Sequence, residues 1–197
     1  MSQNRLNEFA GFELYCGHYG FDEFTFLATT HKLVTNFRDP VDRIYSLYRF
    51  WKLAVPDQAL SSLLPLDAAC VSYAKNLSFG EFIRHDDPAL RLYLDDFHFR
   101  QLLKTPWRNH KTGKREMELV KVRIAALSWF FVAELPSEST ITFNNAFPEL
   151  VIEKMPVKNA SPREEHQLGK DDAAFLRARN SNDYEIYNYA RTLLEAA

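Results

Sequence analysis

The chain has 197 residues, enough for one domain with a substantial core, and its 46% hydrophobic and 25% charged residues are typical of a globular protein. Its 24 basic and 26 acidic residues give a formal net charge of -2, which argues against a broad basic face for duplex nucleic acid. The two cysteines provide no disulfide framework and no zinc spacing, and no run of 18 apolar residues predicts a membrane span.

Two apolar runs near the start of the chain predict strands. FELYCGHYGF (12–21) is apolar and aromatic, and we expect a strand that ends at Gly17 and His18. The residues 22–30 are expected to form a short connector with a helical turn. KLVTNF (32–37) has the length and composition of a buried strand. These two runs are the first candidates for a sheet.

A helix is predicted directly after the strand 32–37. Asp39 stands where an N-cap belongs, and Pro40 stands at the first helical position, where its missing N–H costs nothing. Apolar residues then recur at the spacing of one helix face. They are Ile44, Leu47, Tyr48 and Trp51.

The remainder of the chain is expected to be mostly helical. Further segments with helical period or composition cover residues 67–76, 78–85, 88–103, 116–130 and 171–197. Ser78 is a candidate N-cap. FFVAEL (130–135) predicts a short strand, 105–116 a polar loop, and 139–151 either a helix or a hairpin. Strands that alternate with helices favour an α/β domain with a partly parallel sheet, and no domain boundary is visible within 1–197.

Arg38 follows the strand 32–37 directly, at the edge of the sheet where open α/β proteins bind ligands. The helix that begins there directs its free N–H groups and the positive end of its dipole to the same space. Ser46 lies about two turns into this helix, and helical side chains tilt toward the N-terminus. A guanidinium and a hydroxyl so placed suit a terminal phosphate monoester. The alternative is that Arg38 pairs with a neighbouring carboxylate and that Ser46 is incidental.

The segment NFRDPVDRIYSLYRFW (36–51) resembles the 3′-phosphate-binding segment of the PAPS-dependent sulfotransferases, especially the carbohydrate-directed group that includes the heparan sulfate 2-O-sulfotransferases. PAPS, 3′-phosphoadenosine 5′-phosphosulfate, is their sulfuryl donor, and no metal is expected. The family pattern falls on Arg38, Asp39, Pro40, Arg43, Ser46 and Tyr48. The resemblance implies that Arg38 and Ser46 bind the 3′-phosphate and that Arg43 helps to hold the nucleotide, unless Arg43 pairs with a surface carboxylate.

YCGHYGF (15–21) is similar to the family's Gly-His segment, which precedes the Arg-Asp-Pro strand. The histidine of that segment is the catalytic base in the heparan sulfate 2-O-sulfotransferases, and it corresponds to His18. Histidine side chains as a class titrate near neutrality, which suits general-base work. The alternative for His18 is a structural residue at a strand end. The remaining histidines, interpreted as surface or structural residues without metal-ligand spacing, are His31, His85, His98, His110 and His166.

Two further regions follow the family's order. DDFHFRQLL (95–103) resembles an N-x-x-T-R-x-L segment, with Asp96 and Phe99 in place of Asn and Thr. PVKNASPR (156–163) and NDYEIYNYA (182–190) resemble the C-terminal region, where Asn-x-Ser and an Asp-x-x-Leu/Ile-Tyr helix recur. The candidate contacts are Arg100 and Lys158 for the anionic donor or acceptor, and Asn159 and Ser161 for the nucleotide. The alternative for the last two is an ordinary turn.

The family's loop for the 5′-phosphosulfate, with a pattern like P-K-T-A/G-G-T-S, has no counterpart in the sequence; HKTGK (110–114) is similar only in composition. The resemblance implies a three-layer α/β sandwich with a mostly parallel sheet, related to the P-loop nucleotide kinases, and without this loop we expect it to be N-terminally incomplete. In-line group transfer depends on the positioning and charge stabilisation that this loop supplies. Either the missing piece lies upstream or catalysis has been lost. The first is favoured, because a sheet without its central first strand exposes unpaired edges.

The favoured hypothesis is a single sulfotransferase domain that transfers a sulfuryl group from PAPS to a hydroxyl of a carbohydrate. The alternative is a truncated or non-catalytic relative that only binds 3′-phosphoadenosine nucleotides. A nucleotide-dependent kinase or hydrolase is disfavoured, because it also needs a phosphate loop. In addition, the sequence shows no carboxylate in a motif that would bind magnesium. Family members in animals sit in the Golgi behind a membrane anchor; this sequence shows none, so a cytoplasmic location is expected, with no nucleic-acid partner.

Overall fold

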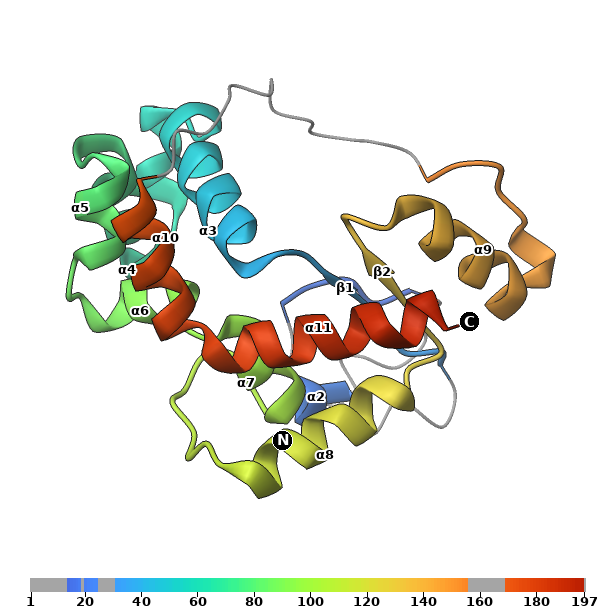
Figure 1. The fold of residues 1–197 in the computed structure, drawn as a ribbon. Helices are drawn as coiled ribbons and strands as arrows, with labels where there is room; N and C mark the ends of the chain where they lie inside the picture. Colours follow the sequence, from blue (N-terminus) through green and yellow to red (C-terminus); the bar gives the residue numbers. More distant parts are fainter. Residues whose placement is uncertain (1–13, 19, 25–30, 156–168, 197) are drawn as a thin grey trace.

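The computed structural model describes residues 14–18, 20–24, 31–155 and 169–196, and most of them are helical (Figure 1). The first half contains α2 (Phe21–Phe24), α3 (Pro40–Arg49), α4 (Pro65–Asn76), α5 (Phe79–Arg84), α6 (Pro88–Leu94) and α7 (Phe97–Leu103). The second half contains α8 (Lys114–Ala125), α9 (Pro136–Ala146), α10 (Lys170–Arg179) and α11 (Ser181–Glu195). A π-helical turn (Phe50–Ala54) continues α3, and 3-10 turns cover Asp57–Ser62 and Pro148–Leu150.

The sheet of the described residues consists of two parallel strands, β1 (Val34–Phe37) and β2 (Trp129–Val132). The pairing continues past β2, where the Ala133 N–H donates to the Phe37 carbonyl at 3.0 Å. The strand predicted over 32–37 is thus confirmed, but it is not uniformly buried: Val34 is 48% exposed and Phe37 is 1% exposed. The described part is therefore an α/β arrangement with a small parallel sheet.

The strand predicted over residues 12–21 is wrong for the residues that the structure describes there. Residues 14–18 form no strand, and Phe21 already begins α2. This segment lies against the end of α7 instead of the sheet. The Asp22 N–H donates to the Lys104 carbonyl at 3.3 Å, and a Cβ at Gly20 would lie 1.9 Å from that oxygen. Close backbone contact, which a glycine permits, decides the path of this segment.

Two hydrophobic clusters form the core of the described residues. One lies between the sheet and α7, α8 and α11, and its fully buried members include Phe37, Phe99, Val120, Val132 and Ile186. The other lies between α3, α4, α5, α6 and α10. Its fully buried members include Ile44, Cys70, Phe82, Leu94 and Leu176. The ring of Tyr184 on α11 packs against both clusters. The carboxyl end of β1, where α3 begins, lies where the two clusters meet.

Local sequence signals account for several helix starts. Asp39 caps α3, because its carboxylate accepts from the N–H groups of Val41 and Asp42. Ser78 and Glu81 form a reciprocal capping box at α5. Both predicted caps are confirmed. The predicted apolar face is confirmed as well: Ile44 and Tyr48 of α3 and Trp51 of the π-helical turn are buried, and Leu47 is partly buried against them.

The helix predicted over 88–103 is broken into α6 and α7. Asp96 takes a left-handed conformation with φ 44° between them. Contacts with α11 hold it there: its N–H donates to the Asn180 side chain at 3.0 Å, and its carboxylate accepts from the Asp183 N–H at 3.0 Å. Asp183 in turn accepts from the Phe99 N–H at 2.7 Å. The break is a tertiary feature that helical periodicity alone does not contain.

Candidate functional site

The carboxyl ends of the two parallel strands lie side by side. Asp39 follows β1 after Arg38, and Glu134 follows β2 after Ala133. The Asp39 N–H donates to Glu134 Oε1 at 3.1 Å, which ties the two ends together. This is the sheet edge at which α/β proteins bind ligands.

The first turn of α3 does not offer the free N–H groups that the sequence predicted. Pro40 has no N–H, and the N–H groups of Val41 and Asp42 donate to Asp39 Oδ1 at 2.9 and 3.2 Å. The Arg43 N–H donates to the Asp39 carbonyl at 2.9 Å. That part of the prediction is wrong because the carboxylate and the carbonyl of Asp39 already accept the hydrogen bonds of these N–H groups. An anion at the start of α3 would have to be bound by side chains instead.

The side chains of Arg38 and Ser46 are available to bind an anion. Both residues are half-buried. Neither the guanidinium of Arg38 nor the hydroxyl of Ser46 has a hydrogen-bond or ion-pair partner within residues 14–18, 20–24, 31–155 and 169–196. The pairing of Arg38 with a neighbouring carboxylate, the alternative from sequence, is not seen in this part of the chain.

Two tyrosines of α11 reach the strand ends. The Tyr184 hydroxyl donates to Asp39, 3.1 Å from Oδ1 and 3.2 Å from Oδ2. The Tyr187 hydroxyl donates to Glu134 Oε2 at 3.0 Å. Burial raises the pKa of both phenols, and the Glu134 hydrogen bond adds to this at Tyr187. Both hydroxyls therefore stay protonated as donors to carboxylates.

His18 is exposed, and its ring stands edge-on to Phe97 with ring centroids 5.8 Å apart. The Arg43 guanidinium lies 5.3 Å from the centroid of the same Phe97 ring. Phe97 at the start of α7 thus brings together two of the residues that the sequence singled out. The His18 side chain is exposed to solvent.

His98 belongs to the same neighbourhood, although the sequence interpretation treated it as a surface or structural residue. Its ring lies edge-on to Phe37, the last residue of β1, at 6.1 Å. Burial, and then the charges of Arg43 and His18, lower the pKa of His98 to about 3. The imidazole is therefore neutral at physiological pH. No sequence spacing marks this residue, because its position depends on the packing of α7 against β1.

Arg43 and Arg100 use their guanidinium groups to cap helix ends. Arg43 donates to the Tyr93 carbonyl at 3.0 Å and the Leu94 carbonyl at 3.4 Å, at the end of α6. Arg100 is 4% exposed and donates to the Leu92 carbonyl and, at 3.1 Å, to the Asp95 carbonyl. Cations stabilise the carboxyl ends of helices in this way. These contacts lend no support to the predicted ligand-binding roles of Arg43 and Arg100.

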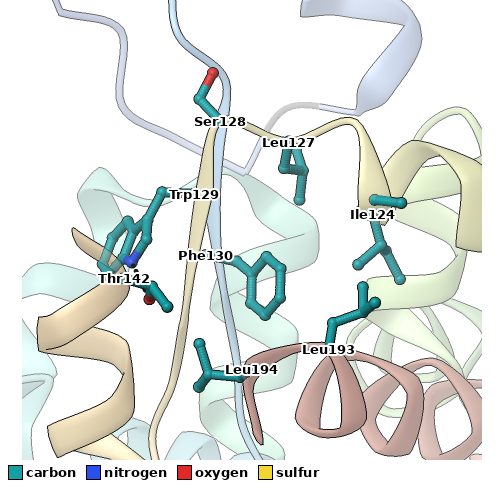
Figure 2. Close-up of a pocket in the computed structure, with 9 residues that line it drawn as sticks. Ile124, Leu127, Ser128, Trp129, Phe130, Thr142, Leu193 and Leu194 are labelled. Atoms are coloured by element: carbon teal, nitrogen blue, oxygen red, sulfur yellow. Dashed lines mark hydrogen bonds between the residues drawn. The ribbon is translucent and has the colours of Figure 1, made fainter. Parts of the chain in front are cut away.

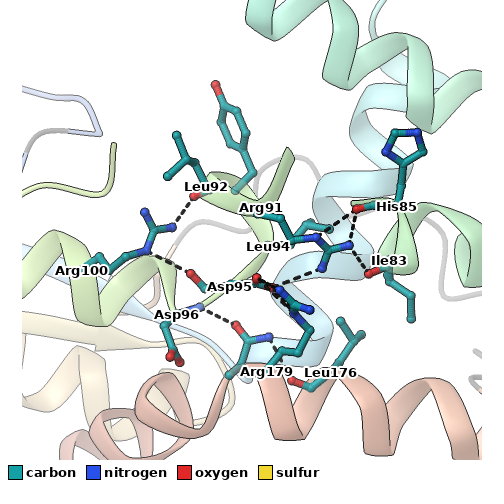
Figure 3. Close-up of polar contacts among 12 residues, drawn as sticks. Ile83, His85, Arg91, Leu92, Leu94, Asp95, Asp96, Arg100, Leu176 and Arg179 are labelled. Carbon is teal, nitrogen blue, oxygen red and sulfur yellow. Dashed lines mark hydrogen bonds and ion pairs between the residues drawn. The ribbon is translucent and has the colours of Figure 1, made fainter. Parts of the chain in front are cut away.

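The surroundings of Arg100 form an extended polar network between α5, α6, α7 and α10 (Figure 3). Arg91 donates to the carbonyl of Ile83 at 2.6 Å, at the end of α5. Asp95, between α6 and α7, accepts from Arg179 of α10 at 2.5 and 3.0 Å and pairs with Arg91 at 3.4 Å. These arginines therefore hold helices together.

The remaining predicted contacts, Lys158, Asn159 and Ser161, lie outside the described residues. The basic run 108–115 is exposed, but the loop before it is fixed, because the Trp107 ring packs edge-on against Tyr93 at 5.3 Å and Phe97 at 5.9 Å. Within the described ranges no cluster of three or more metal-ligating side chains occurs. None of the helices described is long and apolar enough to cross a membrane.

A separate cavity of about 260 Å³ opens at the other end of β2 (Figure 2). Its lining is mainly apolar, from α8, β2 and α11, with Leu127, Phe130 and Leu193 directed into it. The Trp129 indole N–H at its margin donates to the Ser139 carbonyl at 3.0 Å and is not free for a ligand. The cavity contains none of the residues singled out from the sequence.

Comparison of the chain with models of protein families, with characterised proteins and with solved structures finds no match. The functional argument therefore depends on the residues themselves. They provide a guanidinium and a hydroxyl after β1 that have no partner in the described ranges, and an exposed imidazole beside Phe97. This set is suited to binding a phosphate monoester and accepting a proton.

Proposed function

We propose that this chain is a sulfotransferase domain that transfers a sulfuryl group from PAPS to a hydroxyl of a carbohydrate. The finer fold would then be the three-layer sandwich of the P-loop nucleotide kinases. The observation that carries the proposal is the guanidinium of Arg38, which has no side-chain partner among the residues that the structure describes. It stands at the carboxyl end of a parallel strand, within an Arg-Asp-Pro segment, and the Ser46 hydroxyl follows on the next helix.

The proposed roles follow from these positions. Arg38 and Ser46 bind the 3′-phosphate of the donor through charge-assisted hydrogen bonds. His18 removes the proton of the acceptor hydroxyl as its oxygen attacks the sulfur. The bond between sulfur and the 5′-phosphate oxygen breaks, and adenosine 3′,5′-bisphosphate leaves with the bonding electron pair. Arg43 and Arg100 are left out, because their guanidinium groups bind backbone carbonyls.

One observation favours a second candidate, a protein that binds 3′-phosphoadenosine nucleotides without catalysis. Neither described strand is followed by a glycine-rich loop with a lysine: β1 leads into Arg38-Asp39-Pro40, and β2 leads into Ala133-Glu134-Leu135. Backbone amides and a lysine at such a loop stabilise the charge of the moving group. Binding and turnover must therefore be measured separately.

Calorimetric titration with adenosine 3′,5′-bisphosphate, beside adenosine 5′-monophosphate, tests the binding claim. Arg38→Ala should lower affinity for the bisphosphate by about 100-fold, the scale of two hydrogen bonds to a charged group, and leave the monophosphate unchanged. The matched control is Arg108→Ala, which removes an exposed arginine of the basic loop. Equal binding of the two nucleotides would overturn the proposal.

Turnover is tested with sulfur-labelled PAPS and a panel of polysaccharide and oligosaccharide acceptors. Transfer that depends on His18 and survives His110→Gln would establish the enzyme. Binding that requires the 3′-phosphate, without transfer to any acceptor, would favour the non-catalytic alternative.

A further inference from the structure

The backbone on both sides of Arg38 is fixed, although its guanidinium has no partner in the part of the chain that the structure describes. Before it, the Phe37 carbonyl accepts from the Ala133 N–H at 3.0 Å. After it, the Asp39 N–H donates to Glu134 at 3.1 Å. Because the main chain on both sides of Arg38 is already held, an anionic ligand that binds the guanidinium has only the side chain to immobilise, which lowers the entropic cost of binding.

The side chains that hold this arrangement come from α11, far away in the sequence. Tyr184 and Tyr187 are one turn apart on the same helix, so their hydroxyls reach neighbouring points. Tyr184 contacts Asp39, 145 positions away, and Tyr187 contacts Glu134, 53 positions away. One hydroxyl thus serves the end of β1 and the other serves the end of β2.

The helix that carries these tyrosines is itself anchored. The Asp183 N–H donates to the Asp96 carboxylate at 3.0 Å, and Ile186 is fully buried in the core. Asp39 keeps its capping bonds to Val41 and Asp42 without any tyrosine. The tyrosine hydroxyls therefore do not make the cap; they fix where the capped strand end lies.

We propose that Tyr184 and Tyr187 are positioning residues for Arg38, which hold the two strand ends so that the guanidinium is preset for a phosphate monoester. The inference rests on the proposed function, because it concerns the same anion site. Neither hydroxyl contacts the ligand itself. Their effect passes through Asp39 and Glu134 to the backbone of Arg38.

The test uses Tyr184→Phe and Tyr187→Phe, which keep the packed rings and remove only the hydroxyls. The matched control is Tyr189→Phe on the same helix, whose hydroxyl has no hydrogen-bond partner in the described part of the chain. Affinities for adenosine 3′,5′-bisphosphate and adenosine 5′-monophosphate are measured by calorimetry, well below each variant's unfolding midpoint. Each of the two tyrosine variants should lose about fivefold to tenfold for the bisphosphate only, the scale of one hydrogen bond.

The outcomes separate the two proposals. If the unmodified chain shows no preference for the bisphosphate, the proposed function falls, and this inference falls with it. If that preference is present and Tyr184→Phe and Tyr187→Phe retain it in full, only the positioning role is overturned. If one variant does not fold, the other decides, since each hydroxyl serves a different strand end. Equal losses for both nucleotides would indicate a general structural defect and would also contradict the inference.

Discussion

Asp96 and Asp183 cap each other's helices. The Asp96 carboxylate accepts from the Asp183 N–H at 3.0 Å in the first turn of α11, and the Asp183 carboxylate accepts from the N–H groups of His98 and Phe99 in the first turn of α7. This exchange joins the helix that carries Phe97 and His98 to the helix that carries the two tyrosines. Both parts of the candidate site therefore depend on it.

We predict that Asp183→Ala lowers the free energy of unfolding by about 2–4 kcal/mol, because it removes a cap and leaves two buried N–H groups without an acceptor. Asp183 is 1% exposed, so water cannot readily replace it. Asp183→Asn keeps the shape and one of the two acceptor oxygens, so it should cost less than alanine, although its amide NH2 group then faces the second N–H. Urea denaturation measures both values, and equal losses would show that the hydrogen bonds do not carry the effect.

The lowered pKa of His98 predicts that the stability of the fold depends on pH. The folded imidazole has a pKa of about 3, whereas in the unfolded chain its pKa is that of an ordinary histidine, about 6.5. Between these values the unfolded state binds more protons, so acidification from pH 6.5 toward 3 destabilises the fold, by at most about 1.4 kcal/mol per pH unit. His98→Gln should flatten this part of the profile. Chemical denaturation of both proteins from pH 7 to 4.5 checks it; identical profiles would contradict the assignment.

We predict that substitution of Gly20 causes a packing defect that extends to His18. A Cβ at this position would lie 1.9 Å from the Lys104 carbonyl oxygen, so Gly20→Ala must displace the segment from α7. The His18 ring should then leave Phe97, and its NMR signals should lose the ring-current shift. The control is Gly80→Ala in α5, where the nearest atom is 3.5 Å away and alanine favours the helix. An unchanged His18 signal in Gly20→Ala would contradict the account.

Local chemistry made part of this structure predictable. Asp39 and Ser78 mark helix starts through hydrogen bonds to residues two or three positions away, and Pro40 marks one because it lacks an N–H; sequence alone contains these signals. The break at Asp96 and the role of His98 could not be predicted, because they depend on contacts with α11 and β1 across long stretches of chain. The strand predicted over 12–21 failed because apolar composition does not specify a partner: Leu14 and Cys16 are exposed in the structure, and the backbone contact of this segment is with the end of α7.

In the candidate site, too, local features could be predicted from the sequence and long-range contacts could not. The position of Arg38 follows from a strand, a turn and an Asp-Pro cap, and the structure places it accordingly. The sequence could not reveal that Asp39 would use the first N–H groups of α3, or that two tyrosines would reach the strand ends. An isolated N-cap and an N-cap within a network have the same sequence pattern.

The central claim is that Arg38 and Ser46 bind one 3′-phosphate together. A double-mutant cycle with Arg38→Ala and Ser46→Ala, titrated calorimetrically with adenosine 3′,5′-bisphosphate and adenosine 5′-monophosphate, tests it most directly. We predict that each variant weakens bisphosphate binding, that their effects are not additive, and that the monophosphate is unaffected. Bisphosphate affinity that is unchanged by both substitutions, in a folded protein, would contradict the account.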